Sequence, residues 1–304
     1  PRNVHKSIMS AIVFAGAIPI FIHPEVDIDL GISHGISPES VEKALRDYPD
    51  SKAVLVINPT YFGFVADLQK IVQIVHNYNI PVIVDEAHGV HIKFHDDLPL
   101  SAMQAGADMA ATSVHKLGGS MTGSSVLNVK EGLISTKRVQ SVLSMLTTTS
   151  TSYPLLASLD TARRQLAING YDLLEEAIRI AKDTRKRINT IPHLSCVGRE
   201  KLGSPATFDM DPTKLLISVK DLGITGHEAE EWLRQNANLE VELSDLYNIL
   251  CIVTIADTKK EMNLLVNALT RMSNYFDSEA AITEVKVTIP EIPALAMTPR
   301  DAFY

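Results

Sequence analysis

Short apolar runs alternate with amphipathic stretches of helical spacing in the first half of the chain, and this alternation is the strongest constraint on its fold. The runs are too short for helices and lie at residues 53–57, 81–84, 109–112 and 125–129. Between the first two, Asp67 precedes a segment whose apolar residues recur every three or four positions. Continuous apolar strands joined by helical crossovers indicate a parallel or mixed sheet that is covered on both faces.

The rest of the chain extends this α/β organisation. Helices are expected at residues 7–15, 37–47, 155–166 and 171–187, and a strand is expected at 18–22. A smaller α/β unit then combines strands at 214–219, 239–243 and 249–254 with helices at 225–236 and around 262–272. We therefore expect a large domain at residues 1–190, a small α/β domain at 191–277 and an extended, proline-punctuated segment at 278–304.

Composition excludes several classes of protein. The formal net charge of −8 argues against non-specific nucleic-acid binding and suits cationic ligands. Cys196 and Cys251 stand in no disulfide framework and no zinc-ligand spacing, which favours a reducing compartment. No run reaches the roughly 18 apolar residues of a membrane span, and no basic segment with an apolar core precedes a cleavage site in these residues. We expect a cytoplasmic protein that binds neither membranes nor nucleic acid.

Two short motifs carry the chemistry. VIVDEAHG places a carboxylate, Asp85, at the end of an apolar strand, and SVHK places Lys116 directly behind a serine and a histidine. Pyridoxal phosphate needs an amine for its aldehyde, a carboxylate for its ring nitrogen and polar groups for its phosphate. Either residue alone is more often structural, as a turn former or a surface charge. Together, at the carboxyl ends of strands, they predict a pyridoxal phosphate site.

Several blocks in a fixed order resemble a known family. PRNVHKS, NPTYFG, VDEAHG, LPLSAMQAGAD, SVHK, SYPLLASLDTAR and VELSDLYNIL are similar to the major domain of the ornithine/lysine/arginine decarboxylases. The resemblance runs from Pro1 to the final TPRDAFY. It implies a fold-type I, aminotransferase-like α/β architecture with a mixed, mostly parallel sheet, a homodimer or higher oligomer, and a role in polyamine biosynthesis. It also implies that the polypeptide continues in both directions.

The resemblance assigns roles to individual residues. Lys116 would form the Schiff base with pyridoxal 5'-phosphate, and Asp85 would pair with the pyridinium nitrogen. The other implied cofactor contacts are Ser113 and His115 at the phosphate, His5 and Ala87 on the two ring faces, His88 near the cofactor or the substrate carboxylate, and Thr60 at the ring edge. Glu242 would bind the distal cation of the substrate. The chain departs from the family pattern at Gly123, where many members carry glutamine.

Other functions remain open at this point. The same fold supports aminotransferases and lyases, and a chain without a phosphate loop could be a catalytically incomplete module. The substrate could be arginine, lysine or ornithine. DEAH at residues 85–88 matches a helicase motif, but no phosphate-binding loop accompanies it. His88, His91 and His95 could suggest a metal site, although the surrounding sequence favours a loop or strand and hence no metal.

Overall fold

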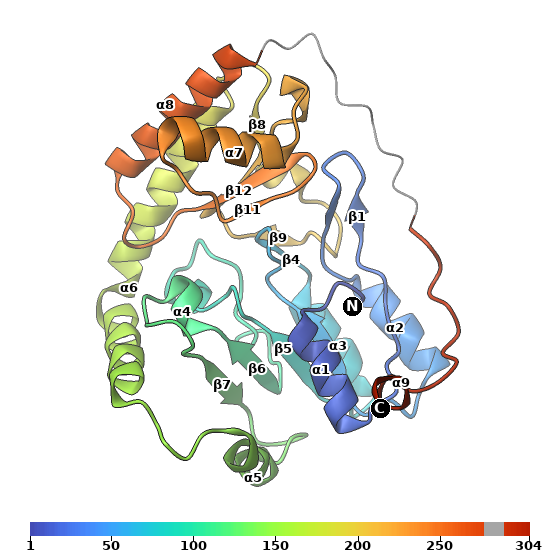
Figure 1. Cartoon of the computed structure of the whole chain (residues 1–304). Coiled ribbons are helices and arrows are strands. Elements are labelled where there is room, and N and C mark those ends of the chain that lie inside the picture. The colour runs from blue at the N-terminus through green and yellow to red at the C-terminus, as the bar shows by residue number, and fades with distance from the viewer. Residues whose placement is uncertain (277–288) are drawn as a thin grey trace.

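The computed structural model describes residues 1–276 and 289–304. Two four-stranded sheets organise the chain, and the long helix α6 (Tyr153–Ile188) runs past both of them (Figure 1). The expected α/β class is confirmed, and so is the mixed, mostly parallel sheet of the first half.

The first sheet has the strand order β3-β5-β6-β7. Its strands are β3 (Val54–Ile57), β5 (Val82–Asp85), β6 (Met109–Thr112) and β7 (Val126–Val129). The first three are parallel and β7 is antiparallel to β6. The crossover helix α3 (Leu68–Asn77) begins at Asp67, whose carboxylate accepts a hydrogen bond from the backbone of Lys70. This helix buries its predicted apolar stripe, Leu68, Ile71, Val72 and Val75.

Helix α2 (Pro38–Asp47) packs beside α3. Ser37 caps α2, and Pro38 occupies the first turn, where its missing N–H leaves no bond unmade. The short elements before it are α1 (Lys6–Ala15), β1 (Val26–Asp27) and β2 (Ile32–Ser33). Near the other end, α9 (Pro299–Phe303) lies against α1, where the Arg300 guanidinium donates to the backbone carbonyl of Val13.

The second sheet is antiparallel and has the order β11-β12-β10-β8. Its strands are β8 (Ser195–Cys196), β10 (Lys214–Ser218), β11 (Leu243–Ser244) and β12 (Asn248–Ile252). Helices α7 (Gly226–Ala237) and α8 (Lys259–Tyr275) cover it together with the carboxyl half of α6 (Figure 1). Both α7 and α8 begin with a capping box, in which a threonine and a glutamate satisfy each other's backbone N–H. A core of its own fills this part of the molecule.

A two-stranded sheet connects the part of the molecule around the first four-stranded sheet with the part around the second. Strand β4 (Phe64–Val65) follows the loop after β3, and it pairs with β9 (Asp209–Met210) just before β10. The backbone N–H of Asp211 also donates to the carbonyl of Gly63 at 2.8 Å. This pairing brings the start of β10 next to the end of β3.

The remaining elements are short helices and α5 (Thr136–Leu146). Three turns of 3-10 helix lie at η1 (Ile92–Phe94), η2 (Arg199–Lys201) and η3 (Lys220–Leu222). Helix α4 (Val114–Leu117) is a single turn after β6. Among residues 1–276 and 289–304, no helix is long and apolar enough to cross a membrane.

Three expectations about secondary structure were wrong. Residues 18–22 form no strand, because their backbone finds no neighbouring strand and Ile18 remains exposed. The two helices expected at 155–166 and 171–187 are one helix, α6. Gly170 does not break it, and a Cβ at this position would lie 3.3 Å from the side chain of Phe94, so the glycine permits close packing. The strand expected at 239–243 is reduced to β11.

The predicted domain boundaries remain a prediction. Helix α6 ends at Ile188, close to the expected boundary at residue 190. The expected extended segment at 278–304 falls partly outside the described residues. Its described end contains α9, which is helical.

Candidate active site

The predicted carboxylate and amine lie at the same edge of the first sheet. Strand β5 ends at Asp85, which pairs in register with Ala111 of the parallel strand β6. After β6 the chain turns at Ser113 into α4, which carries Lys116. Because adjacent parallel strands end at one edge, Asp85 and Lys116 both reach the region where α/β sheets bind their ligands.

His88 stands between two lysine side chains. Its Nε2 atom is 3.0 Å from Nζ of Lys116, and its Nδ1 atom is 3.3 Å from Nζ of Lys214. His88 is buried, and Lys214 is only 1% exposed. The ring of Tyr61 lies 4.4 Å from the ring of His88, centroid to centroid. The imidazole of His88 therefore lies between Lys116, which the sequence analysis predicted as a site residue, and the buried Lys214.

The electrostatics of this group favour a neutral imidazole. Burial, followed by the positive charges of Lys214 and Lys116, lowers the pKa of His88 to about 3. Burial also lowers the pKa of Lys214 to about 8, although the carboxylates of Asp211 and Glu242 oppose this effect. At neutral pH His88 carries no charge, and it has one N–H donor and one acceptor nitrogen.

Lys214 was not predicted from the sequence. It begins strand β10, and Arg185 of α6 holds this strand start by donating to the carbonyl of Lys214 at 2.7 Å. A lysine that opens the apolar run LLI is the signal that could have identified it, since lysine is rarely buried without a partner. Its Nζ also lies 5.8 Å from the ring centroid of Tyr61.

Asp211 supplies a negative charge that interacts with Lys214. Its carboxylate is fully buried, contacts Nε2 of His91 at 2.9 Å and accepts a hydrogen bond from the Thr213 hydroxyl at 2.6 Å. Burial alone would raise the pKa of Asp211. The charges of His91 and Lys214 and these hydrogen bonds instead hold the pKa well below its ordinary value. Asp211 is therefore a buried, negatively charged carboxylate that interacts with Lys214.

Glu242 reaches the site through Tyr61. The Tyr61 hydroxyl donates to Oε1 of Glu242 at 2.7 Å. Burial and this carboxylate raise the pKa of Tyr61 to about 12, so the phenol keeps its proton. Glu242 is itself exposed. It therefore offers a carboxylate at the open side of the group that contains His88 and Lys116.

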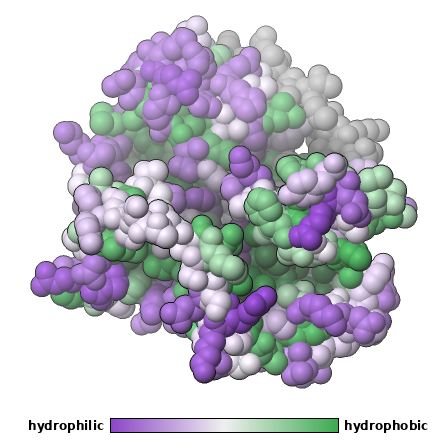
Figure 2. All heavy atoms as spheres, turned by 60° about the horizontal axis from the view of Figure 1, so that its bottom comes forward, coloured by the Kyte–Doolittle hydropathy of each residue, from purple (hydrophilic) through white to green (hydrophobic). Residues whose placement is uncertain are grey.

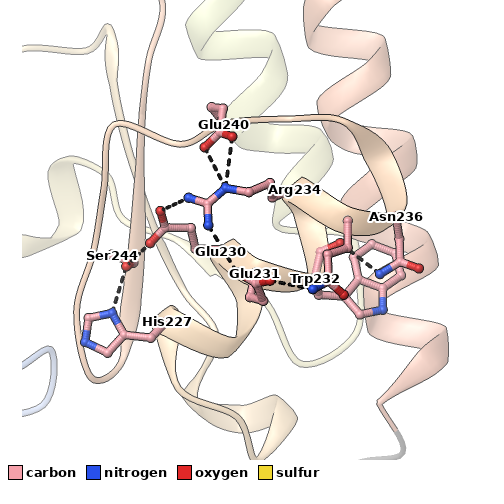
Figure 3. Close-up of polar contacts among 9 residues, drawn as sticks. His227, Glu230, Glu231, Trp232, Arg234, Asn236, Glu240 and Ser244 are labelled. Carbon is pink, nitrogen blue, oxygen red and sulfur yellow. Dashed lines mark hydrogen bonds and ion pairs between the residues drawn. The ribbon is translucent and has the colours of Figure 1, made fainter.

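Helix α7 holds the segment that carries Glu242. Arg234 of α7 contacts Glu240 at 2.9 Å, and Glu230 of the same helix accepts a hydrogen bond from Ser244 (Figure 3). Glu240 and Ser244 lie on either side of Glu242 in the chain. Anchoring at both positions fixes where the carboxylate of Glu242 can stand.

The other predicted residues are placed as follows. Ser113 caps α4 without a side-chain hydrogen bond. The Nδ1–H of His115 donates to the carbonyl of Ser124 at 2.7 Å, so only Nε2 points elsewhere. The Thr60 hydroxyl is buried and accepts from the backbone N–H of Phe64. Thr60 thus supports the turn before β4.

Ala87 contacts Asp85, whereas His5 contacts a residue of α1. The backbone N–H of Ala87 donates to Oδ1 of Asp85 at 3.2 Å, which orients that carboxylate. His5 caps α1 by accepting from the backbone N–H of Ser7. Among the contacts of the described residues, none joins His5 to Lys116, His88 or Asp85.

The side chains present fit the groups of pyridoxal phosphate. Asp85 has one oxygen engaged by Ala87 and one left for a ring N–H. The hydroxyl of Ser113 is not used by the helix that it caps. Lys116 supplies an exposed amine. The chemistry of this donor set matches an aldehyde, a ring nitrogen and a phosphate.

The three histidines that suggested a metal point to different partners. His88 contacts the two lysines, His91 contacts Asp211, and His95 contacts Glu175 at 2.7 Å. Within the described residues, no group of three or more histidine, cysteine, aspartate or glutamate side chains could hold a metal ion. The segment is neither strand nor regular helix, since only η1 interrupts it.

A separate cavity of about 630 Å³ lies between β6, β7 and α6. Its wall includes Glu86, Thr112 and Leu166 but not Lys116, His88 or Lys214. Burial raises the pKa of Glu86, which accepts hydrogen bonds from the Ala102 N–H and the Thr112 hydroxyl. The surface of this cavity is mostly apolar, and neither Lys116 nor Lys214 lines it.

Comparison with known proteins agrees with the resemblance in the sequence. The chain is 66% identical over 305 residues to an arginine decarboxylase of Bacillus anthracis and 64% identical over 306 residues to an arginine decarboxylase of Bacillus subtilis. It is covered completely in both comparisons, and it spans 62% of the length of each relative.

Solved structures show the same fold. The lysine decarboxylase of Francisella novicida matches with a TM-score of 0.75 and 22% identity, over 90% of this chain and 44% of that one. A NifS-like protein of Rickettsia africae matches with a TM-score of 0.65 and 17% identity, over 89% and 74%. The family model of the Orn/Lys/Arg decarboxylase major domain matches residues 1–261. The chain therefore belongs to the Orn/Lys/Arg decarboxylase family, and its fold is that of the aminotransferase-like α/β proteins.

Proposed function

We propose that this chain binds pyridoxal 5'-phosphate and takes part in the decarboxylation of a basic amino acid, with arginine as the first candidate, to the corresponding amine and carbon dioxide. The observation that carries the proposal is the position of the Lys116 amine and the Asp85 carboxylate at one edge of the first sheet. The relatives named arginine decarboxylase favour arginine over lysine and ornithine.

Each residue has a defined task in this proposal. The cofactor, when bound, supplies an aldehyde for the lysine and a cationic ring that accepts the electrons left when carbon dioxide departs. Asp85 keeps a proton on the ring nitrogen through a charge-assisted hydrogen bond. Lys116 holds the cofactor and later releases the product amine. His88 lies against the Lys116 amine, where it can orient the amine or the substrate carboxylate.

Phosphate and ring contacts complete the cofactor site. Ser113 donates its hydroxyl to the phosphate. His115 can donate from Nε2 only when its ring carries two protons, because Nδ1–H is engaged by Ser124. His5 and Ala87 are proposed to face the two sides of the ring and Thr60 its edge. For His5 this requires an approach from α1 that only the family resemblance supports.

Glu242 is proposed to bind the distal cation of the substrate. It is an exposed carboxylate, and Tyr61 connects it to His88. A guanidinium or ammonium group could therefore reach Glu242 while the other end of the amino acid lies near Lys116. Replacement by Gln keeps the shape and removes the charge, so Glu242→Gln should raise KM far more than it lowers kcat. Glu39→Gln, an exposed change on α2, is the matched control.

Direct product analysis tests the proposed reaction. The complete protein is incubated with pyridoxal phosphate and, separately, with arginine, lysine and ornithine labelled at the carboxyl carbon. Labelled carbon dioxide and the matching amine are expected, most rapidly from arginine. Borohydride reduction followed by peptide mass analysis should place the pyridoxyl group on Lys116. A keto acid in place of carbon dioxide would indicate an aminotransferase, and a modified peptide without Lys116 would refute the assignment.

We further propose that the protein acts as at least a dimer in a reducing, cytoplasmic setting. Helix α5 buries none of its residues, and its Met145 and Leu146 are 73% and 77% exposed. Figure 2 shows hydrophobic areas between hydrophilic ones on the face at the lower end of Figure 1. Cys196 and Cys251 are free thiols. Light scattering of the complete protein should report a mass of at least two chains, and a monomer would contradict the proposal.

A further inference from the structure

The carboxylate of Glu242 is available to a cation from outside the chain. Glu240, two residues earlier, forms an ion pair with Arg234, whereas Glu242 forms none with a lysine, arginine or histidine among the described residues. Its described hydrogen bond comes from the neutral hydroxyl of Tyr61. Lys214 interacts with the charge of Glu242 only through space, without a hydrogen bond. An exposed carboxylate without an ion-pair partner suits a cationic ligand.

The backbone of Glu242 is fixed, so only its side chain can move. Its N–H donates to the carbonyl of Leu250 in β12 at 2.9 Å, and β11 begins at the next residue. Helix α7 holds positions 240 and 244 on either side (Figure 3). A glutamate side chain has several rotatable bonds, and holding its carboxylate in one place removes this freedom. The contact with Tyr61 therefore decides where the carboxylate lies.

Tyr61 is held in place relative to Lys116. It lies in the turn between β3 and β4, where the backbone N–H of Gly63 donates to the carbonyl of Thr60 at 3.0 Å. Its ring packs against His88 with a distance of 4.4 Å between the ring centroids. Nε2 of His88 is in turn 3.0 Å from Nζ of Lys116. The hydroxyl at the other end of the ring reaches the carboxylate that follows from the second sheet.

We propose that Tyr61 is a positioning residue for the substrate: by holding the carboxylate of Glu242, it sets the distance between the cation site and the Lys116 amine. This rests on the proposed function, in which Glu242 binds the distal cation. The phenol remains a donor at physiological pH, because burial and the neighbouring carboxylate raise the pKa of Tyr61 to about 12. One oxygen of Glu242 takes this bond, and the other is left for a guanidinium or ammonium group.

A fixed distance between the two groups selects substrates by length. The guanidinium of arginine lies farther from the α-carbon than the ammonium of ornithine. A carboxylate held by Tyr61 fits one of them better, whereas the carboxylate released in Tyr61→Phe can follow either. Tyr61→Phe should raise KM for arginine about fivefold, the factor that one hydrogen bond contributes, and reduce the preference for arginine over ornithine. The value of kcat should stay within about twofold, because the lost contact binds substrate without reacting.

A double-mutant cycle shows whether Tyr61 acts through Glu242. Butylguanidine has the distal cation and an alkyl stem but no reacting group, and its binding to the complete protein is followed by proton NMR titration. Tyr61→Phe should weaken binding about fivefold and Glu242→Gln about tenfold or more, since the latter removes a charged acceptor. In the Glu242→Gln protein, Tyr61→Phe should cause no further loss. Tyr48→Phe, an exposed phenol at the end of α2, is the matched control and should leave binding unchanged.

The outcomes separate the role of Tyr61 from the proposed reaction. Unchanged binding in Tyr61→Phe would overturn the proposal, and so would losses that add up in the double variant or a wild-type protein that does not bind butylguanidine. Urea unfolding shows that each variant is folded. Coupled losses in a protein that releases no carbon dioxide from any of the three amino acids would refute the proposed function alone. Release of carbon dioxide with uncoupled losses would refute only the role of Tyr61.

Discussion

Gly63 leaves the space that the stem of Lys214 occupies, and replacing it by alanine tests the packing beneath the candidate site. A Cβ at Gly63 would lie 2.7 Å from Cγ and 2.9 Å from Cβ of Lys214. The backbone of Gly63 also has φ of +90°, a conformation that L side chains rarely adopt. Gly63→Ala therefore meets both backbone strain and a steric clash.

The two effects have separate magnitudes. A non-glycine residue at positive φ costs about 1–2 kcal/mol. Overpacking a close-packed interior costs about 1–3 kcal/mol. Lys214 cannot move its stem easily, because these are its first two side-chain atoms and its backbone is held by Arg185. Gly63→Ala should lower the free energy of unfolding by about 2–5 kcal/mol, the sum of these two costs.

Gly123 provides a control that isolates the clash. Its φ is +91°, nearly that of Gly63, but nothing lies within 4 Å of an added Cβ. Gly123→Ala should therefore lower the free energy of unfolding by about 1–2 kcal/mol, the cost of the backbone strain alone. The difference between the two variants, about 1–3 kcal/mol, measures the contact with Lys214.

Urea unfolding, followed by far-ultraviolet circular dichroism and by the fluorescence of Trp232, gives both free energies. Trp232 is the sole tryptophan in the sequence and lies in α7, above the sheet that contains Lys214. Equal losses in Gly63→Ala and Gly123→Ala would show that the stem of Lys214 is not packed against Gly63.

Three further predictions concern packing and charge. Gly226→Ala places a Cβ 2.1 Å from the carbonyl oxygen of Asn248, so overpacking should cost at least about 3 kcal/mol and lower the yield of soluble protein. Because the pKa of His88 falls from 6.5 to about 3 on folding, the unfolded chain binds a proton that the folded one does not. The unfolding free energy should drop by up to about 1.4 kcal/mol per pH unit as pH falls from 6.5 toward 3, and His88→Gln but not the exposed His193→Asn should remove this slope. Asp211→Asn removes a buried charged acceptor and should cost about 1.5–3 kcal/mol in urea unfolding, whereas no loss would show that its hydrogen bonds are dispensable.

Much of the fold could be predicted because its signals are local. The strands β3, β5, β6 and β7 are continuous apolar runs, and α2 and α3 carry their own caps and apolar stripes. These features depend on residues within one turn or one strand. The ends of β5 and β6 then predicted that Asp85 and Lys116 would lie at the carboxyl edge of the sheet, because parallel strands end at one edge, where α/β sheets bind ligands.

Features that depend on distant partners could not be predicted. Residues 18–22 have the composition of a strand, yet a strand exists only where another one pairs with it. Gly170 looks like the end of a helix, and only the approach of Phe94 shows that it permits close packing. The apolar run after Lys214 could have indicated a buried lysine, but the sequence does not show that this lysine joins the site, because that depends on the pairing of β4 with β9.

The sequence alone therefore determined the α/β class, the family, and the pair formed by Asp85 at the end of β5 and Lys116 shortly after the end of β6. Only the tertiary structure decided that His88 is shared by two lysines and that Glu242 reaches it through Tyr61. The physical reason is the range of the forces involved. Helix caps and strand periodicity act between near neighbours in the chain, whereas burial, charge and hydrogen bonding depend on which segments the fold brings together.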